Sequence, residues 1–415
     1  MSSYIIQGGK KLEGVVKVSG SKNASLPILA ASILNGGTTK LYNVPNIHDA
    51  QKMLEILKLL GCKVKKKENK VIIDSSNLKN YEIPENLMRE MRSSVILAGS
   101  IIGRNKKATF SYPGGCDIGA RPIDLHLKAF EKLGISIKEE GGKIECTCDK
   151  IKGTKIDLDF PSVGATENAI LAACLAEGET IITNAAREPE IMDLEKFLNR
   201  MGARVEGAGT NQIKITGVKK LKNVEYNIMP DRIEAGTFLV AGAMTSGKIE
   251  LINVVPEHIE PIINKLQEAN CKIEVENNKI NLIAPKRLKA VDIKTMPYPG
   301  FPTDMQAVFG AAMTISKGTS VIVENIFENR YKYMQELVRM GAKVTIEGRT
   351  AVVKGVKKLH AANVKSTDLR GGAALVLAGL ATNGITEVEE IQYILRGYEN
   401  LEKKLTNLGA KIYLK

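Results

Sequence analysis

Charged and polar side chains stand at the starts of six apolar segments of this sequence, where helices would begin. They are Lys22 with Asn23, Arg92, Thr166 to Asn168, Asp231 with Arg232 and Glu234, Asp304, and Asp368 with Arg370. A helix start offers unpaired backbone N–H donors and a partial positive charge, which attract anions. If these starts converge on one cleft, they form a basic pocket that holds a few carboxylates.

Helix capping is the competing explanation for the acidic and polar members of this set, since Asn, Asp, Thr and Glu are common at helix starts for stability alone. That explanation is weaker for Lys22 and the arginines, because a cation at a helix N-terminus opposes the helix dipole. An anionic ligand would remove the conflict.

A cysteine lies in the glycine-rich stretch FSYPGGCDIGARPIDLH, where Gly114 and Gly115 directly precede Cys116. A segment so rich in glycine offers little for packing a thiol. One interpretation is a tight turn with an incidental cysteine. The other is a loop whose glycines let it change shape while it carries a reactive thiol.

The composition limits the class of protein. Lys and Arg (59) exceed Asp and Glu (46), giving a net charge of +13. Anionic partners are therefore plausible, although a lysine-rich solvated surface explains most of the excess. The first residues lack the pattern of a signal peptide, and no apolar run is long enough to suggest a membrane span.

The six cysteines form no CxxC pair and the four histidines are scattered, so we expect free thiols in a reducing cytoplasm and no zinc site.

A repeat organises the elements that would position these residues. The echoes LKLLGCKV, FEKLGISI, FLNRMGARV, LQEANCKIEV, LVRMGAKVTI and KKLTNLGAKI indicate one unit of about 70 residues, present six times. Each echo predicts the end of an amphipathic helix, capped by Gly or Asn in a left-handed turn and followed by an alternating strand. Ahead of each lies a helix that is apolar on nearly every side, such as TENAILAACLAEG.

The sequence therefore predicts an α/β fold, classed as α+β in some schemes, in which sheets lie outside buried apolar helices. Three units would make one domain and six would make two. We expect domains at 22–229 and at 1–21 plus 230–415, with two chain crossings that allow a hinge and a cleft for the active site. The first strand, YIIQGG, is placed to complete the last unit.

Eight segments resemble the UDP-N-acetylglucosamine enolpyruvyl transferases of bacterial peptidoglycan synthesis. They are GSKNASLPILAASIL, GGCDIGARPIDLH, PSVGATEN, PDRIEAGTF, GFPTDMQA, NIFENR, DLRGGAALVLAGL and LRGYENL, in order from end to end of the chain. The related shikimate-pathway enzymes would show a Gly-Asn-Ala-Gly-Thr segment, which this sequence lacks. The resemblance implies a two-domain inside-out α/β barrel and no metal or other cofactor. It also implies transfer of enolpyruvyl from phosphoenolpyruvate to the 3′-hydroxyl of UDP-N-acetylglucosamine, with release of phosphate.

The resemblance also implies roles for single residues. Cys116 corresponds to the proton donor, on a loop that closes over the substrate, and Asp304 to the leading candidate for the base at the attacking hydroxyl. A carboxylate among arginines ordinarily has a low pKa, so positioning by Asp304 would matter more than its proton affinity. The phosphate of phosphoenolpyruvate would be held by Lys22, Arg121 and Arg396, and Arg330 and Arg370 would lie near its carboxylate. An ordinary surface ion pair is the alternative for each arginine.

The nucleotide-sugar contacts implied by the resemblance are Asn23, Arg92, Arg121, Pro122, Ile123, Asp124, Leu125, Ser162, Val163, Gly164, Asp304 and Ile326. Ser162 and Gly164 could present backbone N–H groups to a diphosphate. His126 is expected to support this set by hydrogen bonding. Because a thiolate opens an epoxide and a carboxylate does so poorly, Cys116 predicts alkylation by fosfomycin.

Two other hypotheses remain open at this point. A basic protein that binds nucleic acid would draw only on the charge excess, and the chain lacks an aromatic-studded basic groove. A catalytically silent paralogue is disfavoured because the catalytic-type residues are present. We therefore expect small-molecule substrates, and neither nucleic acid nor a membrane as partner.

Overall fold

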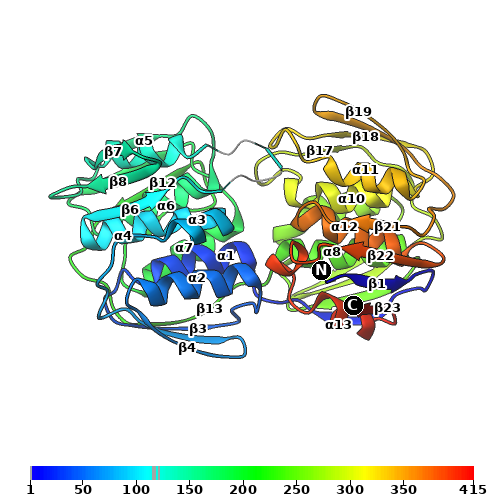
Figure 1. The fold of residues 1–415 in the computed structure, drawn as a ribbon, viewed down its shortest axis with the longest axis horizontal. Coiled ribbons are helices and arrows are strands. Elements are labelled where there is room, and N and C mark those ends of the chain that lie inside the picture. Colours follow the sequence, from blue (N-terminus) through cyan, green and yellow to red (C-terminus); the bar gives the residue numbers. More distant parts are fainter. Residues whose placement is uncertain (1, 115–117, 120–121) are drawn as a thin grey trace. The chain divides into compact units, whose positions relative to one another are not determined.

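The computed structural model describes residues 2–114, 118–119 and 122–415, so Cys116 and Arg121 lie outside the described residues. The described chain divides into two compact units (Figure 1). The N-terminal unit comprises residues 20–114 and 122–229. The C-terminal unit comprises residues 2–19 and 230–415, together with Ile118 and Gly119.

The N-terminal unit contains three helices that are buried along most of their length, and three outer helices. The buried ones are α1 (Lys22–Ala31), α4 (Leu97–Asn105) and α6 (Val163–Ala173). The outer ones are α2 (His48–Leu59), α5 (Asp124–Lys132) and α7 (Pro189–Arg200). A short helix α3 (Glu85–Glu90) and a 3₁₀ turn η1 (Arg92–Ile96) lead into α4.

Three sheets complete the N-terminal unit. The first has the order β13 (Val224–Asn227), β3 (Thr38–Tyr42), β5 (Lys70–Asp74) and β4 (Lys63–Lys67). The second has three strands among the described residues, β6 (Lys107–Ser111), β8 (Lys143–Thr147) and β7 (Ser136–Glu140). The third has the order β11 (Val205–Glu206), β12 (Gln212–Thr216), β10 (Glu179–Thr183) and β9 (Lys155–Asp157).

The C-terminal unit repeats this plan. Its buried helices are α8 (Arg232–Met244), α10 (Gln306–Thr314) and α12 (Leu369–Leu380), and its outer helices are α9 (Glu260–Glu268), α11 (Lys332–Arg339) and α13 (Leu401–Asn407). Four 3₁₀ turns occur in the described chain: η1, η2 (Pro256–Ile259), η3 (Thr303–Met305) and η4 (Ile394–Arg396).

The three sheets of the C-terminal unit have four strands each. The first has the order β15 (Lys272–Glu276), β16 (Lys279–Ile283), β14 (Lys248–Ile252) and β2 (Glu13–Lys17). The second runs β17 (Ile293–Lys294), β18 (Thr319–Val323), β20 (Thr350–Lys354) and β19 (Lys343–Glu347). The third runs β21 (Asn363–Lys365), β22 (Ile385–Glu389), β1 (Tyr4–Gln7) and β23 (Lys411–Leu414).

The buried helices form the centre of each unit because their small residues let backbones approach closely. All thirteen residues of α8 are buried. A Cβ atom at Gly99 of α4 would stand only 2.5 Å from the backbone oxygen of Asn168 in α6. The strands alternate buried and exposed side chains, as in Glu179–Thr183, which is typical of sheets that cover a core on one face. The prediction of sheets outside apolar helices is confirmed.

Two local predictions from the repeat are also confirmed. The echo glycines Gly61, Gly134, Gly202, Gly341 and Gly409 all have positive φ, and Asn270 has a φ of 72°. Each lies just past an outer helix, where a left-handed residue ends the helix before the next strand. The first strand joins the last repeat, since β1 pairs with β22 and β23 (Figure 1).

None of the helices in the described part of the chain is both long enough and apolar enough to cross a membrane.

Candidate functional site

In the C-terminal unit, the Asp304 carboxylate lies between two buried guanidinium groups. Its Oδ1 accepts a hydrogen bond from Arg330 Nη2 at 2.7 Å. Its Oδ2 accepts from Arg370 Nη2 at 2.9 Å and from Arg370 Nε at 3.3 Å. The three residues come from separate repeats: Asp304 from η3 before α10, Arg330 from the segment before α11, and Arg370 from the first turn of α12.

The ionisation of this cluster follows from its charges. Burial alone would raise the pKa of Asp304, but the guanidinium groups of Arg370 and Arg330 outweigh it and hold that pKa well below the usual range. Burial alone would lower the pKa of Arg370, and Asp304 more than offsets that effect. The expected low pKa of Asp304 is confirmed, so at neutral pH this carboxyl is ionised and is a weak base.

One buried nitrogen of Arg330, Nε, has no acceptor among the described residues, and the remaining Nη1 of Arg370 has none nearer than the Tyr398 hydroxyl beside it. The side chains of Arg330 and Arg370 are only 3% exposed, and their planes are flanked by the rings of Phe327 and Tyr398. Buried charged donors are normally paired, so the unpaired Arg330 Nε favours an oxygen of an anionic ligand as its partner.

Arg396 and Ile326 belong to the same unit. Arg396 ends the turn η4 and is half-buried. The backbone N–H of Ile326 donates to the Glu324 carboxylate at 2.9 Å.

In the N-terminal unit, Lys22 opens α1 and forms an ion pair with Asp49 in the first turn of α2, at 3.1 Å. Both side chains are mostly buried. Ser21 caps α1, since its hydroxyl accepts from the Ala24 N–H at 3.2 Å. Asn23 follows on the first turn and is half-buried. Asp49 was not identified from the sequence as the partner of Lys22. Its place in the first turn of a helix was only a weak signal.

The segment after the undescribed Arg121 leads into α5. Arg92 at the start of η1 donates to the Pro122 carbonyl at 3.4 Å. Ile123 is buried, and Asp124 and Leu125 begin α5. The structure thus places Arg92 beside this segment.

Ser162 is the N-cap of α6, and Val163 and Gly164 form its first turn. The Ser162 hydroxyl accepts from the Ala165 N–H at 3.4 Å. The Ser162 N–H donates to the Phe160 carbonyl at 2.7 Å. The turn before the helix therefore uses this N–H in this structure.

His126 is held by Asn168. The Asn168 Nδ2 group donates to His126 Nδ1 at 2.7 Å and to the Val95 carbonyl at 3.0 Å, while its Oδ1 accepts from the Gly99 N–H at 2.8 Å. Since an amide nitrogen only donates, Nδ1 is the acceptor and a neutral ring carries its proton on Nε2. A Cβ at Gly164 would stand 2.9 Å from the His126 ring, so glycine permits this approach.

Replacing Asn168 by leucine is expected to lower the free energy of unfolding by about 2–4 kcal/mol, because it leaves the buried Gly99 N–H without its acceptor and removes two further buried hydrogen bonds. Urea denaturation followed by circular dichroism measures the change. Asn227→Ala, at an exposed position, is the control and should change stability by less than about 0.5 kcal/mol. Equal losses in the two variants would contradict this account of Asn168.

Two other carboxylates at helix starts are buried and do not cap their helices. Glu167 in α6 is 2% exposed, and burial, reinforced by Glu190 and Glu188, raises its pKa well above the usual range. Glu234 in α8 is also buried, with a pKa of about 6, and contacts the Lys404 amino group. The caps of these helices are Ser162 and Asp231.

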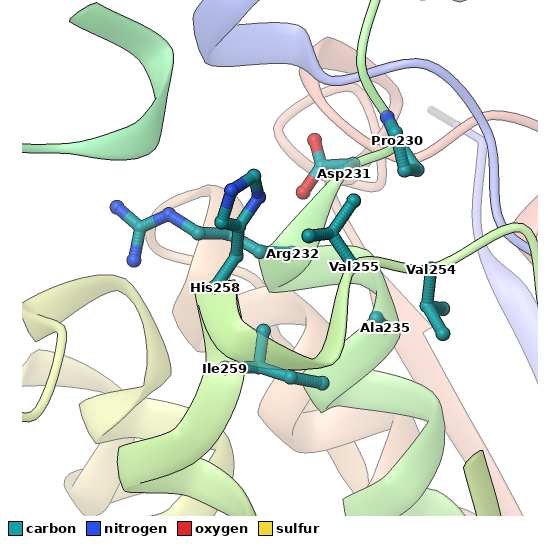
Figure 2. Close-up of a pocket in the computed structure, with 8 residues that line it drawn as sticks. All are labelled: Pro230, Asp231, Arg232, Ala235, Val254, Val255, His258 and Ile259. Atoms are coloured by element: carbon teal, nitrogen blue, oxygen red, sulfur yellow. The ribbon is translucent and has the colours of Figure 1, made fainter. Parts of the chain in front are cut away.

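Asp231 and Arg232 line a shallow pocket at the start of α8, together with His258 (Figure 2). The Asp231 carboxylate accepts from the backbone N–H groups of Ile233 and Glu234, at 2.8 and 2.9 Å. Arg232 lies over the Tyr298 ring, 5.7 Å from its centroid. The pocket is formed around a capped helix start rather than around the Asp304 cluster.

Among the residues that the structure describes, no group of three or more His, Cys, Asp or Glu side chains is arranged to hold a metal ion.

The comparisons with known proteins agree on one family. Residues 6–405 match the family described as EPSP synthase (3-phosphoshikimate 1-carboxyvinyltransferase). The chain is 54% identical over 413 residues to UDP-N-acetylglucosamine 1-carboxyvinyltransferase 2 of Caldanaerobacter subterraneus subsp. tengcongensis, covering 99% of both chains. It is 51% identical over 412 residues to UDP-N-acetylglucosamine 1-carboxyvinyltransferase of Geobacter metallireducens, again covering 99% of both.

Solved structures show the same fold. The enolpyruvyl transferase NikO from Streptomyces tendae superposes with a TM-score of 0.89 at 23% identity, covering 100% of this chain and 99% of that one. EPSP synthase from Acinetobacter baumannii gives a TM-score of 0.79 at 20% identity, covering 100% of both chains. The match over nearly the whole chain and the relatives of about 50% identity show that this chain belongs to the enolpyruvyl transferase family.

Proposed function

We propose that this protein transfers the enolpyruvyl group of phosphoenolpyruvate to the 3′-hydroxyl of UDP-N-acetylglucosamine, releasing phosphate, as the first committed step of peptidoglycan synthesis in the cytoplasm. The observation that carries the proposal is the Asp304 carboxylate held between the buried guanidinium groups of Arg330 and Arg370, with Arg330 Nε left without an acceptor among the described residues. The names of the relatives at 54% and 51% identity support the choice of acceptor.

The chemistry requires an addition followed by an elimination. The 3′-oxygen bonds to the C2 atom of phosphoenolpyruvate, the methylene carbon gains a proton, and the hydroxyl loses its proton. The C2–O bond to phosphate then breaks, and the methyl carbon loses a proton to restore the double bond. In this proposal Cys116 supplies the proton to carbon, since proton transfer to a carbon atom is slow unless the donor is close and shielded from water.

Asp304 is proposed to orient the attacking hydroxyl. Its lowered pKa makes it a poor proton acceptor in the resting protein, but its two guanidinium partners fix the carboxylate in one position. Arg330 and Arg370 would pair with the carboxylate of phosphoenolpyruvate through their remaining donors. Lys22, Arg121 and Arg396 would carry the phosphate, where positive charge stabilises the departing anion.

The acceptor would be bound by Asn23, Arg92, Ile326, the segment Arg121 to Leu125 and the helix start Ser162 to Gly164. No cofactor or metal takes part, and a thiol at position 116 makes the protein a target for fosfomycin.

Phosphate release tests the proposal. Purified protein with phosphoenolpyruvate is expected to release phosphate when UDP-N-acetylglucosamine is added and to release none above background with shikimate 3-phosphate. Turnover only with shikimate 3-phosphate would assign the protein to the other branch of the family, and no turnover with either acceptor would refute enolpyruvyl transfer.

A further inference from the structure

A fully buried carboxylate, Glu324, lies beside the Asp304 cluster without touching it. Glu324 directly follows strand β18 and is 0% exposed. A buried carboxylate is costly unless hydrogen bonds satisfy it, and here both oxygens are used. Oε1 accepts from the Thr295 hydroxyl at 2.8 Å, and Oε2 accepts from the Thr303 hydroxyl at 2.9 Å.

Glu324 also fixes the backbone of the loop that follows it. Oε1 accepts from the N–H groups of Ile326 at 2.9 Å and Phe327 at 3.2 Å. The Thr295 hydroxyl accepts in turn from the Asn325 N–H at 2.9 Å. Phe327 is the ring beside the Arg330 guanidinium, 5.2 Å from its centroid. One side chain therefore holds the loop that carries Ile326 and flanks Arg330.

The Thr303 hydroxyl links Glu324 to Arg330 through two hydrogen bonds. A hydroxyl has one proton, and that proton is donated to Glu324. The Thr303 oxygen is thereby left as an acceptor, and Arg330 Nη1 donates to it at 2.9 Å. Arg330 Nη2 then donates to Asp304, the residue next to Thr303, at 2.7 Å.

We infer that Glu324 is a positioning residue for enolpyruvyl transfer, acting through Thr303 on Arg330 and Asp304 and through the loop on Ile326. The inference rests on the proposed function. Glu324 is not placed to touch substrate in this account. It sets which way the Thr303 hydroxyl points, and so which guanidinium nitrogens remain for the anion.

Glu324→Gln tests the direction of these hydrogen bonds with almost no change in the shape of the side chain. A glutamine replaces one acceptor oxygen by a donating NH₂ group, which must face either the Thr303 hydroxyl or the N–H groups around Oε1. Either choice breaks part of the network. We expect kcat/KM for phosphoenolpyruvate to fall about 10- to 100-fold, with a rise in KM for phosphoenolpyruvate, in steady-state phosphate release.

Substitutions at Thr303 separate positioning from simple structural damage. Thr303→Val removes the acceptor for Arg330 and should resemble Glu324→Gln, whereas Thr303→Ser keeps the hydroxyl and should stay within about threefold of wild type. If Glu324 acts through Thr303, kcat/KM of the double variant Glu324→Gln/Thr303→Val should be little lower than that of the less active single variant. If the losses in kcat/KM of the two single variants multiply in the double variant, the proposed action of Glu324 through Thr303 is contradicted.

Leu405→Ala is the control for stability. Leu405 is fully buried in α13 of the same unit, and its truncation is expected to cost stability while leaving kcat/KM per folded protein unchanged. If Leu405→Ala loses activity as Glu324→Gln does, the effect at Glu324 is structural and the inference fails.

Hydrogen exchange measured on the peptide that contains residues 324–330 tests the inference without relying on activity. Exchange should be faster in Glu324→Gln than in wild type or Leu405→Ala, because the Ile326 and Phe327 amides either lose their acceptor or keep only a neutral amide oxygen, which binds them less strongly than a carboxylate. Unchanged exchange with wild-type turnover in the variant would overturn the inference. An inactive wild-type protein with faster exchange in the variant would instead refute the proposed function and leave the loop-holding role of Glu324 in place.

Discussion

Replacing Asp304 by alanine is expected to abolish measurable turnover and to lower the free energy of unfolding by roughly 2–4 kcal/mol. The loss of stability arises because Arg330 and Arg370, only 3% exposed, would face each other without the carboxylate that separates them. The loss of activity arises because the same carboxylate orients both guanidinium groups and, in the proposed function, the attacking hydroxyl. Phosphate release and urea denaturation measure the two effects.

Asp304→Asn separates charge from shape. The amide fills the same space but removes the negative charge between the two arginines, so we expect kcat to fall about 10²- to 10⁴-fold. Glu268→Ala is the matched control, since Glu268 is a surface carboxylate of the same unit paired with Lys265 and should matter little to stability or activity. Wild-type kcat in Asp304→Asn would contradict the role given to this residue.

The pH dependence of stability provides a further check on Asp304. Its pKa in the folded protein lies well below the ordinary value of 3.8, so its charge stabilises the fold fully above the unfolded-state pKa. That contribution is lost only as the pH falls below about 4 and through the folded-state pKa. The stability difference between wild type and Asp304→Asn should therefore be constant from pH 8 to about pH 5 and shrink at lower pH.

Replacing Cys116 by alanine is expected to lower kcat about 10²- to 10⁴-fold and to eliminate covalent modification by fosfomycin. Wild-type protein should gain the mass of one fosfomycin molecule, because a thiolate opens the epoxide ring. Cys116→Asp should keep turnover, since a carboxyl group can also donate a proton, but should resist the inhibitor. Intact-mass spectrometry and phosphate release distinguish the three proteins.

The other cysteines explain why a single adduct is expected. Burial raises the pKa of Cys62 to about 11 and the pKa values of Cys146, Cys174 and Cys271 to about 12, so these thiols hold little thiolate at neutral pH. Cys148 is half-buried and also has a raised pKa. Cys148→Ala is the control and should keep the adduct. A wild-type protein without an adduct would count against the assignment of Cys116.

The fold was predictable because its signals are local and repeated. A glycine or asparagine after an amphipathic helix fixes a left-handed cap wherever it occurs, and six copies made the period visible. The apolar character of segments such as α8 and α12 likewise follows from consecutive residues. The place of the first strand could also be predicted, because YIIQGG precedes the first buried helix and so falls outside the first unit; it pairs with β22 and β23 of the last one.

The candidate site was predictable only in part. The cations could be found because they oppose the dipole at a helix start, and Asp304 because it lies in a segment that resembles a known motif. Their partners could not, because pairs such as Lys22 with Asp49 and Thr303 with Glu324 depend on packing between separate segments. Glu167 was a candidate because a carboxylate near a helix start can cap the helix or line a pocket. In the structure, close helix packing buries Glu167, and burial raises its pKa.

The most direct test of the central claim is the structure of the product. Phosphoenolpyruvate labelled with ¹³C at C2, incubated with UDP-N-acetylglucosamine and this protein, should give a labelled enol ether carbon coupled to the sugar proton at the 3′ position in the NMR spectrum. Label found instead in free pyruvate, at another position of the sugar, or only in unreacted phosphoenolpyruvate would contradict the account.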